Sequence, residues 1–174
     1  MIKASEIIDV PIQEFESKST IYIIHDILLN ADSTKVIGFF CYKKGLKRNS
    51  YILSLKDIAS KSYNSILVKS LGVIQYVKEI KKANFGLSYK ETILNKIVID
   101  NKGELIGILR DMIFDLTTGY LVSFECYFDD ILTGRKLIKA YSGYYFSGGN
   151  IIVPYRDLVK EQGRGLVSLN KLRD

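Results

Sequence analysis

Short apolar runs separated by polar turns dominate the chain and predict β-strands along most of its length. Stretches rich in Ile, Leu, Val, Phe and Tyr last about five to eight residues and end at glycine, asparagine or aspartate. Such runs are too short for ordinary helices, and many alternate with the two-residue period of a strand. The pattern therefore predicts an all-β fold.

One stretch has the full pattern of a β-hairpin. "GILRDMIFD" (107–115) predicts a strand, "LTTG" (116–119) a turn, and "YLVSFECYF" (120–128) the returning strand. Gly119 suits the left-handed position that closes such a turn, and Asp115 stands where a carboxylate accepts N–H bonds from it. Gly107 predicts a bulge or a close approach of another strand. Asp111 and Asp115 would lie about 13 Å apart on one face of the strand, too far for shared chemistry. We expect both to be structural.

The chain also repeats itself. "TIYIIHDILLNADSTKVIGFFCY" (20–42) aligns without gaps on "LIGILRDMIFDLTTGYLVSFECY" (105–127), at an offset of 85 residues. The identical pairs are Ile21 and Ile106, Ile23 and Ile108, Asp26 and Asp111, Phe39 and Phe124, Cys41 and Cys126, and Tyr42 and Tyr127. Downstream, "YILSLKDI" (51–58) aligns on "IIVPYRDL" (151–158), which predicts a fifteen-residue gain in the second copy. A duplicated unit is the simplest interpretation.

The segment between the copies has a different pattern. In "GVIQYVKEIKKA" (72–83), Val73, Ile74, Val77 and Ile80 recur near helical spacing among lysines, and Gly86 supplies a stop. We therefore expect a first unit over residues 1–72, a short helical linker over 73–86 and a second unit over 87–174.

Composition and charge narrow the class of protein. The 174 residues are 47% hydrophobic and 25% charged, as in an ordinary globular protein. No apolar stretch is long enough to span a bilayer, and the N-terminus lacks the pattern of a signal peptide, so we expect a soluble cytoplasmic protein without membrane contact. The net charge of +6 is scattered and favours nucleic acid only weakly.

Candidate chemistry is sparse. His25 is the single histidine, and Cys41 and Cys126 occupy equivalent repeat positions, which favours packed core residues over a nucleophile or a disulfide. No glycine-rich stretch matches a phosphate-binding motif, and the histidine and cysteine count excludes a classical zinc site. We expect no enzyme, no cofactor and no metal.

The hairpin resembles the motif of the PRC-barrel family. "KGELIGILRDMIFDLTTGYLVSFEC" (102–126) carries it, and "NIIVPYRDL" (150–158) resembles the family's closing strand, with Pro154 and Asp157 in place. The residues that carry the hairpin motif are Gly103, Gly107, Asp111, Asp115, Thr118 and Gly119. The first copy keeps Asp26 but has Tyr22, Asn30 and Thr34 where the second has Gly107, Asp115 and Gly119. The first copy therefore resembles a diverged repeat.

This resemblance implies two tandem six-stranded PRC-type β-barrels joined by a helical linker. Barrels of this family are found in the cytoplasmic subunit of photosynthetic reaction centres, in a ribosomal RNA maturation factor and in short bacterial proteins. They are interaction modules, and no catalytic residues travel with the motif. The expected function is a non-enzymatic adaptor whose exposed strand edges bind a partner protein or a second copy of the chain.

Two stretches are candidate interaction surfaces. One is a basic loop of Lys43, Lys44, Lys47 and Arg48, and the other is an aromatic hairpin of Tyr141, Tyr144, Tyr145 and Phe146. If both lay on one face, the chain could instead be an RNA- or ribosome-associated assembly factor, the alternative hypothesis. That hypothesis is weakened because the N-terminal half of the maturation factor should be a different barrel, whereas here it repeats the C-terminal half.

Overall fold

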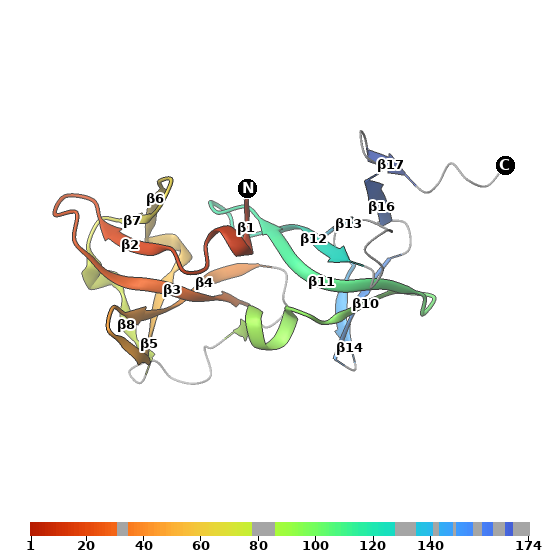
Figure 1. Cartoon of the computed structure of the whole chain (residues 1–174), viewed down its shortest axis with the longest axis horizontal. Coiled ribbons are helices and arrows are strands. Elements are labelled where there is room, and N and C mark those ends of the chain that lie inside the picture. Colours follow the sequence, from red (N-terminus) through yellow and green to blue (C-terminus); the bar gives the residue numbers. More distant parts are fainter. Residues whose placement is uncertain are drawn as a thin grey trace.

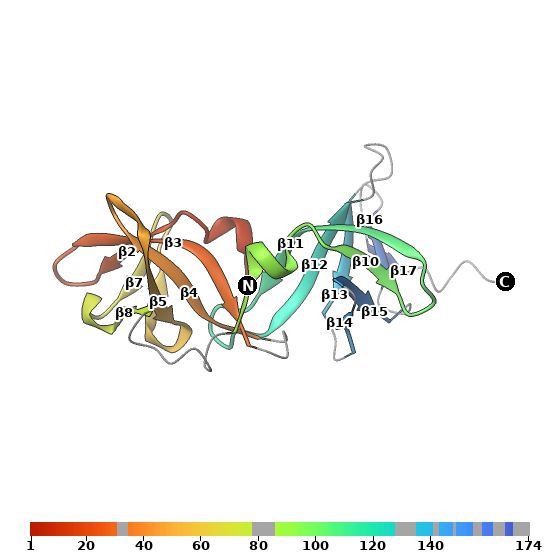
Figure 2. The ribbon, with the colours of Figure 1, turned by 90° about the horizontal axis from the view of Figure 1, so that it is seen from below.

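The computed structural model describes residues 1–30, 35–77, 86–127, 135–140, 143–147, 149–154, 158–161 and 166–168. Within these ranges the chain is mostly β, as the apolar pattern predicts, and the strands form two sheets. Figures 1 and 2 show the sheets at opposite ends of the long axis of the molecule, with the N-terminus and the short helix η6 (Tyr89–Ile93) between them. No helix in the described part of the chain is long and apolar enough to cross a membrane.

The first sheet has the strand order β6-β7-β2-β3-β4-β5-β8, and β9 also pairs with β3. These strands are β2 (Pro11–Glu14), β3 (Thr20–Leu29), β4 (Val36–Lys43), β5 (Leu46–Ser54), β6 (Ile58–Lys61), β7 (Ile66–Val68), β8 (Gln75–Tyr76) and β9 (Leu87–Ser88). Neighbours pair antiparallel except β2 and β7, which are parallel. The long β3 and β4 lie at the centre of this order, and β3 is buried continuously from Asp26 to Leu29.

The second sheet repeats this order as β14-β15-β10-β11-β12-β13-β16-β17, and β1 also pairs with β11. Its strands are β1 (Ile2–Lys3), β10 (Ile97–Asp100), β11 (Leu105–Phe114), β12 (Leu121–Tyr127), β13 (Arg135–Lys139), β14 (Tyr145–Ser147), β15 (Asn150–Val153), β16 (Leu158–Glu161) and β17 (Leu166–Ser168). Besides η6, the described helical turns are the 3₁₀ turns η1 (Ala4–Glu6), η2 (Leu55–Asp57) and η3 (Leu71–Val73).

Strand registers confirm the repeat and correct its second part. Ser54 pairs with Gly38 in the first sheet as Lys139 pairs with Ser123 in the second, at the offset of 85 residues. The predicted match of 51–58 to 151–158 is wrong, because the parallel partner of β10 is β15, and the equivalent partner of β2 is β7. Ile66–Val68 thus correspond to Ile151–Val153 at the same offset, and the second copy has gained no fifteen residues before β15.

Of the helical linker predicted over 73–86, the structure describes only 73–77 and 86, so most of this prediction, residues 78–85, lies outside the described residues. Val73 ends the turn η3, and Gln75 and Tyr76 form β8. The described part of this range is not one continuous helix, and Ile74 is buried between a turn and a strand.

One hydrophobic core extends across both sheets. Phe39 of β4 and Phe114 of β11 are fully buried, with ring centroids 6.4 Å apart. Cys41 and Cys126 are both fully buried, which confirms that these equivalent positions are packed core residues. Burial raises the pKa of the Cys41 thiol far above its usual range.

Candidate functional site

The two sheets are joined by a reciprocal exchange of short segments. β1, at the start of the chain, pairs with β11 of the second sheet, with Ile2 opposite Phe114. β9 pairs in the same manner with β3 of the first sheet, with Leu87 opposite Leu29. Each residue of the second pair lies 85 positions from its equivalent in the first. The contact is therefore that of a two-fold dimer interface, formed within one chain.

A buried carboxylate of the second sheet holds the first exchanged segment. Asp111 in β11 accepts hydrogen bonds from the backbone N–H of Ser5 at 3.2 Å and from its hydroxyl at 2.6 Å. It also accepts a bond from the N–H of Met112 at 2.8 Å, and it is 6% exposed. Because a buried carboxylate needs such donors, η1 is fixed to the second sheet at this point.

Asp26 in β3 holds the second exchanged segment in the same way. It accepts hydrogen bonds from the N–H of Lys90 at 3.1 Å, from the hydroxyl of Ser88 and from the N–H of Ile27 at 2.7 Å. Asp26 and Asp111 are equivalent repeat positions, and both are now seen to be structural anchors between the halves. The sequence indicated a structural role for them but not which segment each would hold.

At the centre of this contact, equivalent residues of the two copies pair with each other. Lys35 forms an antiparallel bridge with Tyr120, its own equivalent in the second copy, and its ammonium lies 4.8 Å from the centre of the Tyr120 ring. The N–H of Val36 donates to the carbonyl of Gly119 at 2.8 Å. Gly119 has a φ of +81°, and a Cβ there would lie 2.3 Å from the carbonyl oxygen of Val36. The left-handed conformation predicted for Gly119 is confirmed, and the close approach adds a second reason for glycine.

The two halves of this interface differ in their side chains. Lys3 forms an ion pair of 2.7 Å with the buried Glu125, whereas Ser88 and Phe40 occupy the equivalent positions. Tyr89 in η6 is almost fully buried and makes a side-chain hydrogen bond with Asp111, so it links the two anchors. Burial, followed by the nearby carboxylates, raises the pKa of the Tyr89 hydroxyl well above its usual range.

The hairpin predicted around Asp115 is confirmed. Its carboxylate accepts bonds from the N–H groups of Thr117 and Thr118 at 2.9 and 2.7 Å and from the Thr118 hydroxyl at 3.0 Å. Bonding to Thr118 lowers the pKa of Asp115 below its ordinary value. Gly107 lies beside a bulge in the pairing of β10 with β11, and Gly103 closes the turn between these strands with a φ of +85°.

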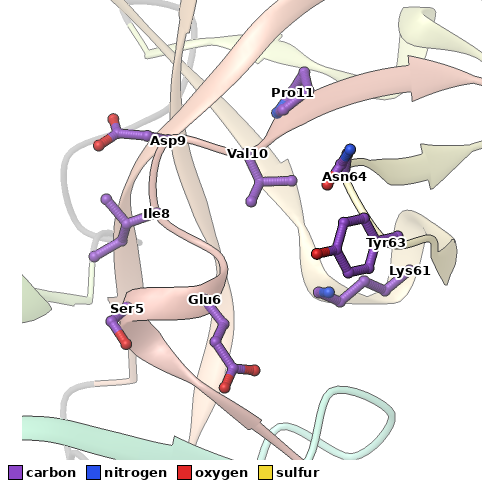
Figure 3. A pocket seen from close by; sticks show the side chains of 9 residues that line it. All are labelled: Ser5, Glu6, Ile8, Asp9, Val10, Pro11, Lys61, Tyr63 and Asn64. Atoms are coloured by element: carbon purple, nitrogen blue, oxygen red, sulfur yellow. The ribbon is translucent and has the colours of Figure 1, made fainter.

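An open groove lies beside the first exchanged segment (Figure 3). Its volume is about 560 Å³. Figure 3 shows the segment from Ser5 to Pro11 along one side and Lys61, Tyr63 and Asn64 along the other. Ile8, Val10 and Pro11 are half-buried apolar residues of its lining, and Figure 3 shows the Val10 side chain directed toward Tyr63 and Asn64, whereas Glu6 and Asp9 are exposed. The ring of Tyr63 is 92% exposed at the rim. The arrangement can receive an extended segment of a partner.

A second, smaller cavity of about 390 Å³ lies beside the other exchanged segment. His25, Phe40, Ser88 and Glu91 are among the residues that line it. Burial is the largest influence on His25 and lowers the pKa of its imidazole. The described residues contain no group of three or more side chains that could hold a metal ion.

The two predicted interaction surfaces lie on different sheets. Lys43 and Lys44 are exposed at the turn from β4 to β5, and Lys47 and Arg48 lie in β5, with side chains outside the description. Tyr144 is half-buried with its ring against Phe124 at 5.0 Å, Tyr145 is 56% exposed in β14, the Phe146 side chain is not described, and Tyr141 and Asp157 lie outside the described residues. The structure does not bring the basic loop and the aromatic hairpin onto one sheet.

The groove was missed from the sequence. Its residues come from two segments that are fifty positions apart at their nearest, and neither matches a motif. Tyr63 gave the one available signal, since it is an aromatic residue in the polar stretch "SKSYNS" (60–65), where no apolar neighbour explains it.

Comparison with known proteins identifies the second half of the chain. We found no curated protein that matches. Residues 86–172 match the family described as the PRC-barrel domain, and they make up half of the chain. This range contains the Asp115–Gly119 hairpin, the anchor Asp111 and all strands of the second sheet except β1. The chain therefore belongs to the PRC-barrel domain family, through residues 86–172.

Proposed function

We propose that the chain is a non-enzymatic protein-interaction module that binds an extended segment of a partner in the groove of Figure 3. In this proposal the first sheet is a second, diverged PRC unit, and the two units form one rigid platform. The matching strand order and registers of the two sheets support the second unit. The groove with its exposed aromatic rim is the observation that carries the binding role.

Local structure supports an extended ligand. β6 is the last strand on its side of the first sheet, and its C-terminal residue Lys61 lines the groove. An outer strand offers unpaired backbone groups to a partner strand, and a pocket at its end can take a side chain of that partner. Tyr63 buries a large area at small entropic cost when a ligand covers it, which is why tyrosine is common in binding sites.

The charged side chains that line the groove narrow the chemistry of the expected partner segment. Glu6 and Asp9 make two carboxylates on one side of the groove, against the single ammonium of Lys61 on the other. A partner segment with an apolar side chain for the apolar part of the lining and a Lys or Arg for Glu6 and Asp9 would match this surface. Such a segment would be attracted to the groove in spite of the chain's net charge of +6.

Selection from a display library of random twelve-residue peptides tests the proposal. We expect the wild-type chain to enrich peptides that combine an apolar residue with Lys or Arg, and Tyr63→Ala to lose their binding. The double variant Glu6→Gln, Asp9→Asn should weaken the selected peptides about three- to tenfold, as for exposed charge pairs. Asn suits position 9 because Asp9 has a φ of 65° and its structural equivalent Asn95 a φ of 64°. Peptides that bind Tyr63→Ala as well as wild type would show that the groove is not the site.

The RNA- or ribosome-associated alternative rests on the exposure of Lys43 and Lys44. Changing Lys43, Lys44, Lys47 and Arg48 to Glu should abolish co-sedimentation with ribosomes if that alternative holds. Co-sedimentation that survives the change, or that never occurs, would eliminate it. The peptide selection is independent of these four positions.

A further inference from the structure

The residues that line the groove all belong to the first half of the chain, but they are held in place by both sheets. Lys61 lies in β6 of the first sheet, Tyr63 and Asn64 lie in the turn between β6 and β7, and Asp9, Val10 and Pro11 are tied to the first sheet as well. The N–H of Asp9 donates to the carbonyl of Ile24 in β3 at 2.7 Å, and the N–H of Ile24 donates to the carbonyl of Val10 at 3.0 Å. This side of the groove therefore moves with the first sheet.

The remaining wall is tied to the second sheet. Ser5 is bonded to Asp111 through its N–H and its hydroxyl, and the preceding residues of β1 pair with β11. Lys3, just before η1, is also paired with Glu125 in β12. Between the two ties, the N–H groups of Ile7 and Ile8 both donate to the carbonyl of Ala4 at 3.2 Å, and the carbonyl of Ile7 accepts a longer bond of 3.4 Å from the N–H of Val10. Glu6 and Ile8 thus take their places in the groove from a contact made to the other sheet.

We infer that the groove is a composite site and that Asp111 is a positioning residue for it, which acts through Ser5. The ligand named in this inference rests on the proposed function, whereas the way in which the groove wall is held does not. A ligand that needs this wall binds the docked arrangement of the halves better than any loosened one, so its binding also strengthens their docking. Loss of the Asp111 anchor should free Glu6 and Ile8 while leaving Asp9 in place.

The repeat supplies a matched control. Asp26 accepts bonds from two backbone N–H groups and one serine hydroxyl, as Asp111 does, but it holds the segment that begins with β9, and Asp111 has a further bond to the Tyr89 side chain. That segment lines the other cavity and contributes no residue to the groove. Asp26→Ala and Asp111→Ala therefore each release one exchanged segment, and only Asp111→Ala releases the groove wall. Asp111→Ala also removes the bond to Tyr89, which lies in η6 and does not line the groove.

Amide hydrogen exchange, followed residue by residue by NMR on the full chain, tests the inference without a ligand. In Asp111→Ala we expect exchange at Ile7 and Ile8 to quicken at least tenfold relative to Asp9, whose bond to Ile24 remains. In Asp26→Ala these amides should keep their wild-type protection, and Leu94, bonded to Tyr89 in η6, should lose its own. Equal acceleration at Ile7 and Ile8 in both variants, or none in either, would overturn the inference.

Two further arms separate the possible failures. If the alanine variants do not fold, Asp111→Asn and Asp26→Asn keep one acceptor oxygen each and must reproduce the same contrast in a milder form. A peptide from the library selection should bind Asp111→Ala at least fivefold more weakly than Asp26→Ala, and equal affinity for the two would overturn the positioning role. If the exchange contrast appears but no peptide is ever selected, the composite wall stands and the proposed function fails.

Discussion

Gly119 offers a sharp test of the contact between the halves, through the substitution Gly119→Ala. A left-handed conformation costs a non-glycine residue roughly 1–2 kcal/mol. The new Cβ would also lie 2.3 Å from the Val36 carbonyl oxygen and 2.8 Å from a methyl carbon of Leu55. Forcing atoms into a well-packed region costs about 1–3 kcal/mol more. We therefore expect a total loss of about 2–5 kcal/mol in the free energy of unfolding.

Gly103→Ala is the matched control. Gly103 has a φ of +85°, close to the +81° of Gly119, but a Cβ there meets nothing within 4 Å. Its substitution should cost only the roughly 1–2 kcal/mol of the left-handed conformation. Urea unfolding followed by far-UV circular dichroism measures both losses. In thermal unfolding, the extra clash should lower the midpoint by about 2–4 °C per kcal/mol for a chain of this size. Equal losses in the two variants would refute the close approach of Val36 to Gly119.

Three more predictions follow from the contacts described. Lys3→Met should lower stability by about 1–3 kcal/mol, because it leaves the buried Glu125 without its 2.7 Å partner, whereas the exposed Lys44→Met should change it by less than about 0.5 kcal/mol in urea unfolding. The pKa of Asp115 is lowered in the folded state, so its contribution to stability is present above the unfolded pKa and is lost as pH falls through the folded pKa. The urea midpoints of wild type and Asp115→Asn should therefore differ at pH 6 and converge toward pH 3. A difference between the two midpoints that stays constant with pH would contradict this. Both cysteine thiols should resist a thiol reagent in the native state and react after denaturation, since both are buried; rapid reaction of either in the native protein would show that its sheet opens.

Local features of the fold could be predicted because their causes are local. The turn at Asp115–Gly119 depends on one carboxylate, two adjacent N–H groups and one glycine, all within five residues. The central part of the repeat was readable for a similar reason, because β3 and β4 match β11 and β12 without a gap.

The failures concern elements whose definition is tertiary. β7 has only three residues, and its identity as the equivalent of β15 follows from parallel pairing with β2, a contact between distant segments. The sequence match of Tyr51–Ile58 to the closing strand rested on apolar spacing that any strand shares. At the start of the expected linking helix, Ile74 is buried between a turn and a strand, so its place in the apolar pattern does not come from a helical face.

The reciprocal exchange was beyond sequence reasoning. Ser5 and Lys90 meet their carboxylates through backbone N–H groups, and a backbone group leaves no trace in residue type. The offset between equivalent residues of the two halves also changes from 85 to 86 after these segments. Asp9 and Asn95, both left-handed, are 86 residues apart, because η6 is a π-helical turn where the first half has the shorter η1.

The meeting of Lys35 with Tyr120 has a consequence for what one chain can do that two identical chains cannot. At the axis of a homodimer, a residue faces its own copy, so a lysine would face a lysine and their charges would repel. Joining the units in one chain frees the two axial positions to differ, and here an ammonium rests over an aromatic ring. The same freedom places Lys3 against Glu125 on one side of the axis and Ser88 near Asp26 on the other. Because both halves belong to one chain, the contact between them need not be symmetric, and its two sides can take on different roles.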